Sequence, residues 1–401
     1  MDIPVELEAP RKIELWTTFF LGRSEMSELK VLHIGGNRYP SLASDYATKG
    51  IWKSLSSGFK EYHVIARALD RKFSVSNDGR VTLHLLPSFI SSMFEFIFTS
   101  WAVIIYVKRI RPDRLVVQCP VIGGMAAAFC SLVFRIPLLV ELHGAHYFAP
   151  KVTGTRGFVE FLFYRLMSPF AFRRAAKIRS LSPHMTEALI EVYGEELRSK
   201  VVEIPTRVDL KMFSSHKSAY EVSSPLKIIT IGSYIPVKNL SRLIEDLHRT
   251  NRDFVLTLVG DGLLAEQYRR LAKQLNLESK VVLTGRLTHE QISHLLVEQD
   301  VYIHYSLTEG MARAILEAMA VGLPVIATNV GFIKGVLEDR ENCILLKDGT
   351  TLDSALSLVL NDKGLRERIG RGGRRMVNDK YDADRVFSSY RKTIAELSLL
   401  D

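Results

Sequence analysis

The stretch EGMARAILEAMAVGLPVIAT, residues 309–328, places two carboxylates eight positions apart before an apolar segment that contains Gly-Leu-Pro. Ser306 stands three residues before Glu309, which is the spacing of a capping box. We therefore expect a helix with Ser306 as its N-cap and Glu309 at its third position. Eight residues of helix rise about 12 Å and rotate about 80° beyond two full turns, so Glu309 and Glu317 would lie along one side.

The first turn of such a helix is suited to an anion. Its backbone amides are free and its N-terminus carries a partial positive charge, which favours a phosphate group. A carboxylate accepts hydrogen bonds from two adjacent hydroxyls, so one glutamate could hold a ribose and the other a sugar ring, with a diphosphate between them. The alternative is that Glu309 and Glu317 are solvated residues on an exposed helix face, where charged side chains commonly lie.

The segments on either side of this stretch alternate between buried strands and helices. The second half of the chain contains the expected strands KIITIGS, FVLTLVGDG, KVVLTG, DVYIHY and PVIAT, with helices at 240–248, 264–275 and 289–297. The first half repeats the alternation with KVLHIGG, EYHVIAR, RLVVQC and PLLVELHG. This pattern predicts parallel sheets covered on both faces, and therefore an α/β protein with two doubly wound, Rossmann-like domains.

A polar segment at 214–227 contains a proline and separates the two runs. We expect an N-terminal extension at 1–28, a first Rossmann-like domain at 29–214, a second at 215–378 and a C-terminal helix at 379–401. Ligands bind beyond the carboxyl ends of the strands in open parallel sheets. The candidate site is therefore expected beyond the carboxyl ends of the strands, where His143, residues 232–238 and Glu309 lie.

The composition is that of a soluble globular protein. The chain has 401 residues, of which 47% are hydrophobic and 24% are charged, and this length suggests two domains. Cys119, Cys130 and Cys343 stand far apart without a Cys-x-x-Cys pair or a histidine cluster, so neither a disulfide framework nor a zinc site is indicated. The first residues mix acidic and basic side chains before any apolar run, unlike a secretory signal, and we expect a cytoplasmic protein.

The formal net charge of +9 favours anionic partners: phosphates, anionic lipid or nucleic acid. No zinc-finger spacing, RNA-binding signature or long basic run occurs, so nucleic acid is not an expected partner. Residues 85–107 are nearly all apolar or small, and residues 156–177 mix large aromatics with arginines. Pro87 and Glu95 argue against a spanning helix, so we expect peripheral association with an anionic membrane surface.

Residues 309–331 consist of Glu309, GMARAIL, Glu317 and AMAVGLPVIATNVG. This arrangement resembles the donor-site signature of the retaining family 4 glycosyltransferases. The chain resembles that family over about residues 29–395. The resemblance implies the GT-B fold, in which two Rossmann-like domains face a central cleft and the C-terminal helix crosses back to the first domain. Further segments follow the order of the family: VLHIGGNRYP, VELHG, SLSPHMTEAL, VVEIPTRVDLKMF, IGSYIPVKNLSRLIE, LVGDGLLAEQ and VVLTGRLTHEQI. The resemblance implies transfer of a hexose from a nucleotide-diphosphate donor, UDP- or GDP-linked, to an acceptor hydroxyl, with retention and without a metal or other cofactor.

The resemblance also implies a role for each matching residue. Glu317 would bind the ribose hydroxyls of the donor, Glu309 the hydroxyls of the transferred sugar, and Lys238 the leaving diphosphate, where negative charge grows in the transition state. His143, in ELHG, matches the first-domain histidine that meets the reacting sugar. Without the resemblance, the lysine would be interpreted as a solvated loop residue and the histidine as structural. The expected donor site also includes Gly310, Met311, Ala312, Gly232, Ser233 and Arg286.

Three departures from the family pattern bear on activity. Ser233 stands where the family usually has an arginine, Ala43-Ser44 where it has Gly-Gly, and Thr206-Arg207 where it has Asn-Gly. One hypothesis is that Arg207 or Arg313 supplies the missing charge. The alternative is a catalytically degenerate nucleotide-sugar-binding protein or a regulatory subunit of a glycosyltransferase complex.

Three other patterns point to different functions. Residues 260–265 form Gly-x-Gly-x-x-Ala after a strand, as in dinucleotide-binding proteins, but Arg286 and no acidic residue follows the next strand. A hydrolase would need Glu309 and Glu317 about 5 to 9.5 Å apart across one bond, and their offset along a helix disfavours that. The Asp-Ala-Asp at 382–384 follows no strand, so we assign no metal.

The resemblance sets the expected mechanism and context. The acceptor would enter through the first domain, and closure would exclude water from the donor. No obvious nucleophile adjoins Glu309, so we expect a front-face substitution in which the leaving phosphate deprotonates the acceptor. The expected acceptor is a glycan or a lipid-linked glycan at the cytoplasmic face of the membrane, as in lipid-linked glycan or surface polysaccharide synthesis.

Overall fold

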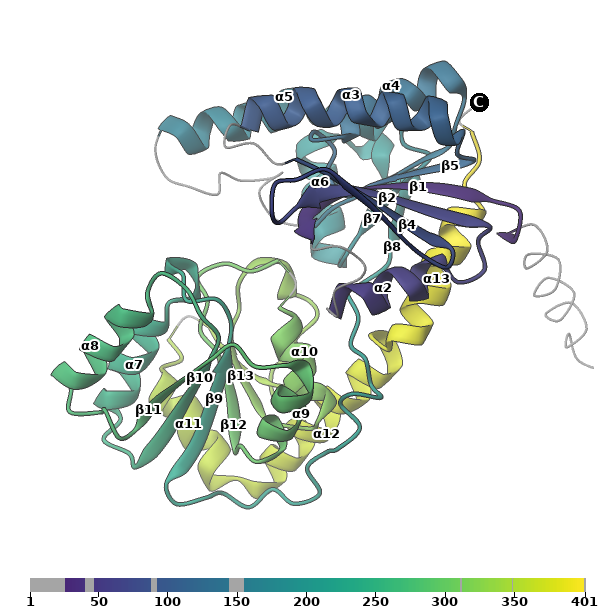
Figure 1. Cartoon of the computed structure of the whole chain (residues 1–401). Coiled ribbons are helices and arrows are strands. Elements are labelled where there is room, and N and C mark those ends of the chain that lie inside the picture. The colour runs from purple at the N-terminus through teal and green to yellow at the C-terminus, as the bar shows by residue number, and fades with distance from the viewer. Residues whose placement is uncertain are drawn as a thin grey trace, which may run out of the picture.

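The computed structural model describes residues 26–39, 47–87, 92–143, 155–310, 312–347 and 349–399. Three features singled out in the sequence lie outside the described residues: positions 1–25 of the expected extension, Ala43-Ser44 and Met311. The described chain forms two mainly parallel sheets, each covered by helices (Figure 1).

The first sheet has eight strands in the order β3-β4-β2-β1-β5-β6-β7-β8. They are β1 (Lys30–Tyr39), β2 (Glu61–Ala68), β3 (Ser74–Asp78), β4 (Val81–Leu86), β5 (Arg114–Val117), β6 (Leu138–Glu141), β7 (Lys177–Ser180) and β8 (Val201–Glu203). β3 is antiparallel to β4 at one edge, and the other neighbours are parallel. β6 is buried along its whole length, which explains its continuous apolar run up to Glu141.

Helices cover both faces of this sheet. One buried cluster contains α3 (Ser92–Ile110), α4 (Gly124–Phe134), α5 (Thr155–Arg174) and α6 (Pro183–Tyr193). A second contains α2 (Ala47–Ser56) and α13 (Ala383–Ala395). Successive strand residues point to opposite faces, so Leu115 joins the first cluster and Val116 the second. Figure 1 shows α3, α4 and α5 as a layer above the sheet and α2 with α13 below it.

The second sheet has six strands in the order β11-β10-β9-β12-β13-β14, and all of its neighbours are parallel. They are β9 (Leu226–Ile231), β10 (Phe254–Val259), β11 (Val281–Gly285), β12 (Val301–His304), β13 (Val325–Thr328) and β14 (Ile344–Leu346). One face packs α7 (Leu240–Arg249), α8 (Ala265–Gln274) and α11 (Leu352–Asn361), and the other packs α9 (His289–Val297) and α10 (Arg313–Ala320). α12 (Lys363–Lys380) contributes side chains to both clusters.

The predicted α/β class with two doubly wound sheets is confirmed. α9 begins and ends at the predicted residues, 289 and 297. Thr288 and Gln291 form a capping box that fixes its start. The sequence analysis missed β3, β4, β7, β8 and β14. All of these except β4 have five residues or fewer, and β3 is a polar edge strand with two of its five residues exposed. The proposed domain boundaries stay predictions.

The apolar stretch at 85–107 divides between β4 and α3, and α3 packs against α4 and β1. Along the described ranges, none of the helices combines the length and the apolar character that crossing a bilayer requires.

Candidate active site

The predicted site residues follow strands of both sheets. His143 comes after β6 in the first sheet, Gly232 after β9 in the second, and the loop that contains Glu309 after β12. The ends of the two sheets approach one another here: a Cβ atom added to Gly310 would lie 3.9 Å from the carbonyl oxygen of His143. The structure therefore brings His143 next to the loop that carries Glu309.

Lys238 and Glu309 form an ion pair at the ends of β9 and β12. The stem of Lys238 passes 3.4 Å from the place where a Cβ atom of Gly232 would be, so this glycine leaves room for the lysine. His304 Nε2 lies 3.7 Å from Glu309 Oε2, but burial and then the charge of Lys238 lower the pKa of His304 to about 3. The histidine is therefore neutral, and Lys238 balances the carboxylate.

The predicted helix start is wrong. α10 begins at Arg313, with Ala312 as its N-cap and no capping side chain, so Ser306 does not cap it. Glu309 lies in the preceding loop and Glu317 within the helix. The two carboxylates are therefore not stacked along one helix side, although both remain at the same end of the sheet.

Tertiary contacts explain why the loop does not wind into helix. The hydroxyl of Thr328 donates a hydrogen bond to the carbonyl of Ser306 at 2.8 Å. A Cβ atom on Gly331, whose φ is +61°, would lie 1.9 Å from the carbonyl oxygen of Glu309. The loop is thus held against the segment after β13, and this contact fixes the backbone of Glu309 more strongly than local helix propensity does.

Glu317 is buried on α10, with 8% of the residue exposed. Burial raises the pKa of its carboxyl group, and the nearby charges of His289 and Arg313 oppose that rise. His289 Nε2 lies 3.8 Å from Glu317 Oε1. A sheltered carboxyl group with a basic neighbour is well placed to accept hydrogen bonds from a bound ligand.

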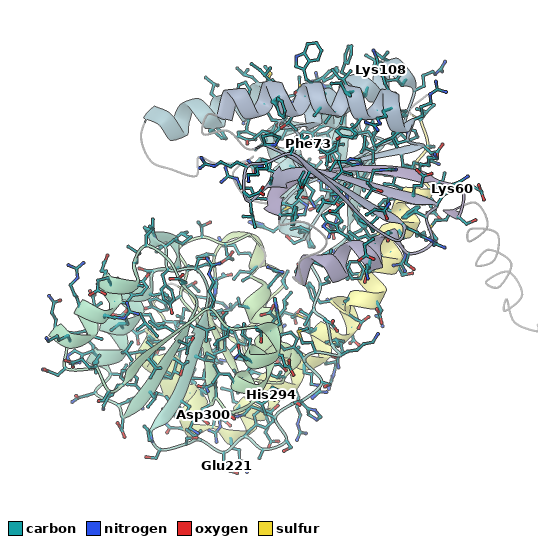
Figure 2. All side chains as sticks on the ribbon, viewed as in Figure 1. Lys60, Phe73, Lys108, Glu221, His294 and Asp300 are labelled. Carbon is teal, nitrogen blue, oxygen red and sulfur yellow. The ribbon has the colours of Figure 1, made fainter. Side chains whose placement is uncertain are left out.

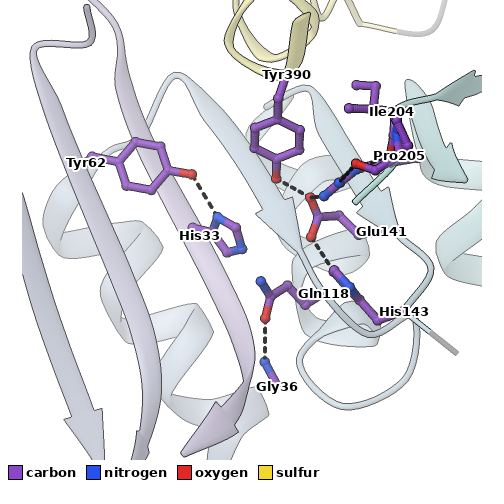
Figure 3. Close-up of polar contacts among 10 residues, drawn as sticks. His33, Gly36, Tyr62, Gln118, Glu141, His143, Ile204, Pro205 and Tyr390 are labelled. Atoms are coloured by element: carbon purple, nitrogen blue, oxygen red, sulfur yellow. Dashed lines mark hydrogen bonds and ion pairs between the residues drawn. The ribbon is translucent and has the colours of Figure 1, made fainter. Parts of the chain in front are cut away.

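His143 is held by a buried carboxylate (Figure 3). Its Nε2 lies 2.6 Å from Glu141 Oε2, and Glu141 is 1% exposed. Burial by itself would raise the pKa of Glu141, but Arg179 and the hydrogen bond from His143 outweigh it, so the pKa is lowered well below its usual range. The carboxylate stays charged and fixes the orientation of the imidazole.

Glu141 also joins three distant parts of the chain. Arg179, on β7, donates to Glu141 Oε1 at 3.2 Å and to the carbonyls of Ile204 and Pro205 at 2.9 Å. Tyr390, on α13, donates to the same carboxylate. Figure 3 shows Glu141 between Tyr390 and His143. The C-terminal helix therefore completes the environment of His143.

The sequence analysis named His143 but missed Glu141, Arg179 and Tyr390. Glu141 and His143 are two positions apart where a strand ends, so their side chains point to the same side, and that spacing was a usable signal. Arg179 and Tyr390 carried no such signal, because they reach the site from elements far away in the sequence.

Arg286 and Ser233, two residues of the predicted donor site, are both exposed. Arg286 is 85% exposed at the side chain and has Asp261 as an ion-pair partner at 3.8 Å, and no contact joins it to the other predicted residues in the described chain. Ser233 is exposed after β9, where its carbonyl accepts a hydrogen bond from the amide of Ile235. Ala312 is buried at the start of α10.

The Gly-x-Gly pattern and the Asp-Ala-Asp motif both have structural roles. A Cβ atom on Gly260, whose φ is +142°, would lie 1.9 Å from the carbonyl oxygen of Gly232, so close backbone approach requires a glycine here. Asp382 is the N-cap of α13 and accepts a hydrogen bond from the amide of Arg385.

A cavity of about 530 Å³ opens beside His143. Its walls come mainly from the first sheet, α2 and α13, and Arg313 contributes from α10. We call it the His143 cavity.

Two family descriptions match consecutive parts of the chain. "Glycosyl transferase 4-like domain" matches residues 51–206, and "Glycosyl transferases group 1" matches residues 213–376. The chain belongs to the group 1, family 4 glycosyltransferases. Together the two matches include every strand of both sheets except β1, and every described residue of the Lys238 and Glu309 site.

Curated relatives share moderate identity with this glycosyltransferase. N-acetyl-alpha-D-glucosaminyl L-malate synthase of Bacillus anthracis is 31% identical over 180 residues, which are 43% of this chain and 46% of that protein. Protein CapJ of Staphylococcus aureus is 24% identical over 312 residues, 72% of this chain and 75% of that protein. Alpha-D-kanosaminyltransferase of Streptomyces kanamyceticus is 24% identical over 330 residues, 71% and 79% respectively.

Solved structures establish the GT-B fold of this glycosyltransferase. Anabaena Alr3699/HepE in complex with UDP and glucose has a TM-score of 0.68 at 18% identity, covering 92% of this chain and 100% of that one. Sucrose-phosphate synthase from Thermosynechococcus elongatus has a TM-score of 0.74 at 16% identity, with the same coverage. The predicted fold is confirmed.

Proposed function

We propose that the protein transfers a hexose from a UDP- or GDP-linked donor to an acceptor hydroxyl, with retention at the anomeric carbon and without a metal or other cofactor. The observation that carries this proposal is the ion pair of Lys238 and Glu309 beside His143. Anabaena Alr3699/HepE, which shares the fold, has been crystallised with UDP and with UDP-glucose, and this supports a nucleotide-sugar donor.

Each charged group has a part in the proposed reaction. Lys238 balances the diphosphate as the bond to the sugar breaks and negative charge grows on it. Glu309 accepts hydrogen bonds from the transferred sugar, and Glu317 from the ribose. The ion pair keeps Lys238 and Glu309 in place before the donor binds, so little rearrangement is needed when it arrives.

Retention is proposed to follow a front-face course. The leaving phosphate takes the proton of the acceptor hydroxyl while that oxygen attacks the anomeric carbon from the same face. His143, oriented by Glu141, contacts the reacting sugar. Trapping of a covalent glycosyl-enzyme intermediate would reject this mechanism.

The donor site can be tested by thermal unfolding with UDP, GDP and ADP sugars. At a hundred times its dissociation constant, a donor should stabilise the protein by about 2.7 kcal/mol. Glu317→Ala should lose this shift, whereas the matched control Glu278→Ala, an exposed glutamate after α8, should keep it. Absence of a shift with every donor in a folded sample would reject the proposed site.

The alternative function is a catalytically degenerate nucleotide-sugar-binding protein or a regulatory subunit of a glycosyltransferase complex. The exposed Ser233, at a position where the family usually has an arginine, favours it. Donor binding without transfer or donor hydrolysis would select this alternative.

We further propose that the protein acts at the cytoplasmic face of a membrane, on a glycan or lipid-linked glycan acceptor. Support comes from exposed large apolar side chains on α3, α4 and α5, three helices that pack side by side. We call this surface the α3–α5 face; its members are Ile97, Phe98, Trp101, Ile105, Phe129, Leu132, Val133, Phe134, Leu162, Phe163, Leu166 and Phe170. A patch of this kind on a soluble domain marks an interaction site.

The charge around the α3–α5 face favours anionic lipid as its partner. Lys108 and Arg109 end α3, Arg135 follows α4, and Arg165 and Arg173 lie on α5, all of them exposed. Figure 2 shows Lys108 at this surface. Apolar side chains rimmed by cations fit a membrane interface with anionic headgroups, which would present a lipid-linked acceptor to the site.

A further inference from the structure

The His143 cavity has the position expected for the second substrate. His143 lines it, whereas Lys238, Glu309 and Glu317, the residues proposed to bind the donor, are not among the described residues of its wall. Its volume of about 530 Å³ lies in the range of small-molecule sites. Given the proposed function, on which this inference rests, the cavity is the acceptor site.

Arg207 brings a positive charge to this cavity. Its guanidinium carbon lies 4.6 Å from the centre of the Phe387 ring, and the residue is half-buried. Burial, and then the charges of Arg179 and Arg313, lower the pKa of Arg207 to about 10, which still leaves the group charged at pH 7. Across the described residues, no hydrogen bond or ion pair joins Arg207 to a carboxylate.

Among the described residues of the cavity wall, Glu141 is the one carboxylate, and it already has hydrogen-bond partners. Glu141 accepts hydrogen bonds from Arg179, His143 and Tyr390. Arg313 lines the same cavity and, like Arg207, forms no ion pair within the described chain. Two guanidinium groups therefore line the cavity without a hydrogen-bonded or ion-paired carboxylate in the described chain, although the charges of Glu141 and Glu317 act on them from a distance.

Two buried polar atoms of the cavity wall also lack partners in the part of the chain that is described. They are His33 Nε2 and Trp52 Nε1, and each residue is 1% exposed. The other ring nitrogen of His33 is bonded to the hydroxyl of Tyr62 at 2.8 Å (Figure 3). An indole N–H can only donate, and a buried donor without a partner is costly, so these two atoms mark a polar and incompletely satisfied part of the cavity wall.

We propose that the His143 cavity binds an acceptor that carries a carboxylate or phosphate group, and that Arg207, with Arg313, binds this anionic group. The acceptor hydroxyl is then placed near His143. Guanidinium groups suit both anions because they offer paired N–H donors. The family usually has glycine where this chain has Arg207, so the charge is a specific feature of this chain.

The donor diphosphate is a rival anion for Arg207, as the departure at Ser233 suggested from the sequence. The structure favours the acceptor instead. Arg207 is stacked on Phe387 of α13 and shares a cavity with residues of the first sheet, whereas Ser233 and Lys238 belong to the loop after β9 and do not line that cavity.

The first test measures anion binding without any donor. Inorganic phosphate and malonate should raise the unfolding temperature of the wild type above that in chloride at equal ionic strength. Arg207→Met, which keeps an apolar stem over Phe387, should lose most of this shift, whereas the exposed control Arg270→Met on α8 should keep it. An equal shift in Arg207→Met, or none in the wild type, would overturn the proposal.

The second test compares acceptors with the best donor. Glycerol 3-phosphate and a small hydroxy acid are each paired with the neutral polyol of the same length, and vesicles containing phosphatidylglycerol distinguish a lipid headgroup from a free acceptor. We expect product with anionic acceptors, and kcat/KM about 10- to 100-fold lower in Arg207→Met. Equal use of charged and neutral acceptors, or a weakened donor Kd in Arg207→Met, would overturn the proposal. If no acceptor reacts, the anion-binding test decides.

These outcomes separate the inference from the proposed function. Phosphate binding that depends on Arg207, together with no binding of any nucleotide-sugar, would reject the donor site and leave the anion site standing. Binding and hydrolysis of the donor, without any shift from phosphate or malonate, would reject the anion site and leave the donor site standing.

Discussion

His143 donates a hydrogen bond of 2.6 Å to Glu141, whose carboxylate is buried among groups from β6, β7 and α13. Glu141→Gln keeps the shape but removes the charge that balances Arg179. Because one partner of a buried pair is then left unmatched, we expect a loss of about 3 kcal/mol in unfolding free energy, measured by urea denaturation. The exposed pair of Glu187 and Arg198 gives the control: Glu187→Gln should leave stability nearly unchanged, because solvent screens an exposed pair. Equal effects would contradict the role given to Glu141.

Lys238→Ala should lower kcat by about 100-fold or more, because the lysine balances charge that develops on the leaving diphosphate. Initial rates of sugar transfer, or of donor hydrolysis, measure this effect. The matched control is Lys273→Ala on α8, an exposed lysine, which should behave as the wild type. If Lys238→Ala raised KM and left kcat unchanged, the lysine would serve ground-state binding and not the transition state.

Glu317→Gln should raise stability and weaken donor binding. Burial raises the pKa of the Glu317 carboxyl group in the folded state above its ordinary value of 4.5. The folded state therefore binds the proton more tightly than the unfolded state does. Stability falls as the pH rises from 4.5 through the pKa of the folded state. At pH 7 the variant should therefore be more stable, by about 1 kcal/mol, and it should bind the donor about 10-fold less tightly. Thermal unfolding and donor titration measure the two effects.

The pH dependence of these differences is the control for Glu317. As the pH falls toward 4.5, the wild-type carboxyl group becomes protonated, and both differences between wild type and Glu317→Gln should shrink. A stability difference that stays constant across that range would show that the substitution acts through packing and not through charge.

The sequence was most informative where local pattern and tertiary structure agree. Buried parallel strands such as β6 and β12 have continuous apolar runs, and α9 has a complete capping box, so both were predictable. The start of α10 was not, because Thr328 at the end of β13 and Gly331 after it hold the Glu309 loop and override the local capping pattern. The short edge strand β3 has too few apolar residues to be recognised.

The site was predictable from the sequence only in part. Lys238, Glu309 and Glu317 belong to motifs, and the family resemblance placed them at one strand edge. Arg179 and Tyr390 reach Glu141 from β7 and α13, which no local spacing connects to His143. Their roles depend on the sheet order and on the return of α13 to the first sheet, and these are properties of the whole fold.

Gly331→Ala should displace the Glu309 loop. A Cβ atom there would lie 1.9 Å from the Glu309 carbonyl, while Gly335, with a similar φ of +76°, has open space around its added Cβ. Both substitutions carry the cost of a positive φ, about 1 kcal/mol. We therefore expect Gly331→Ala to lose more stability than Gly335→Ala and, unlike Gly335→Ala, to weaken donor binding. Equal donor affinity in the two variants would contradict the contact as the determinant of the Glu309 position.

Binding to anionic vesicles should depend on the α3–α5 face. Trp101 and Leu166 are 66% and 64% exposed on α3 and α5. Replacing both with serine removes apolar area that would enter the interface, so partitioning onto phosphatidylglycerol vesicles should fall about 100-fold in co-sedimentation. Leu263→Ser is the matched control, because Leu263 is 93% exposed but lies on the loop after β10. Binding should also weaken as salt screens the surrounding arginines. Equal sedimentation of the double variant and the wild type, or equal binding to neutral vesicles, would reject this face as the membrane contact.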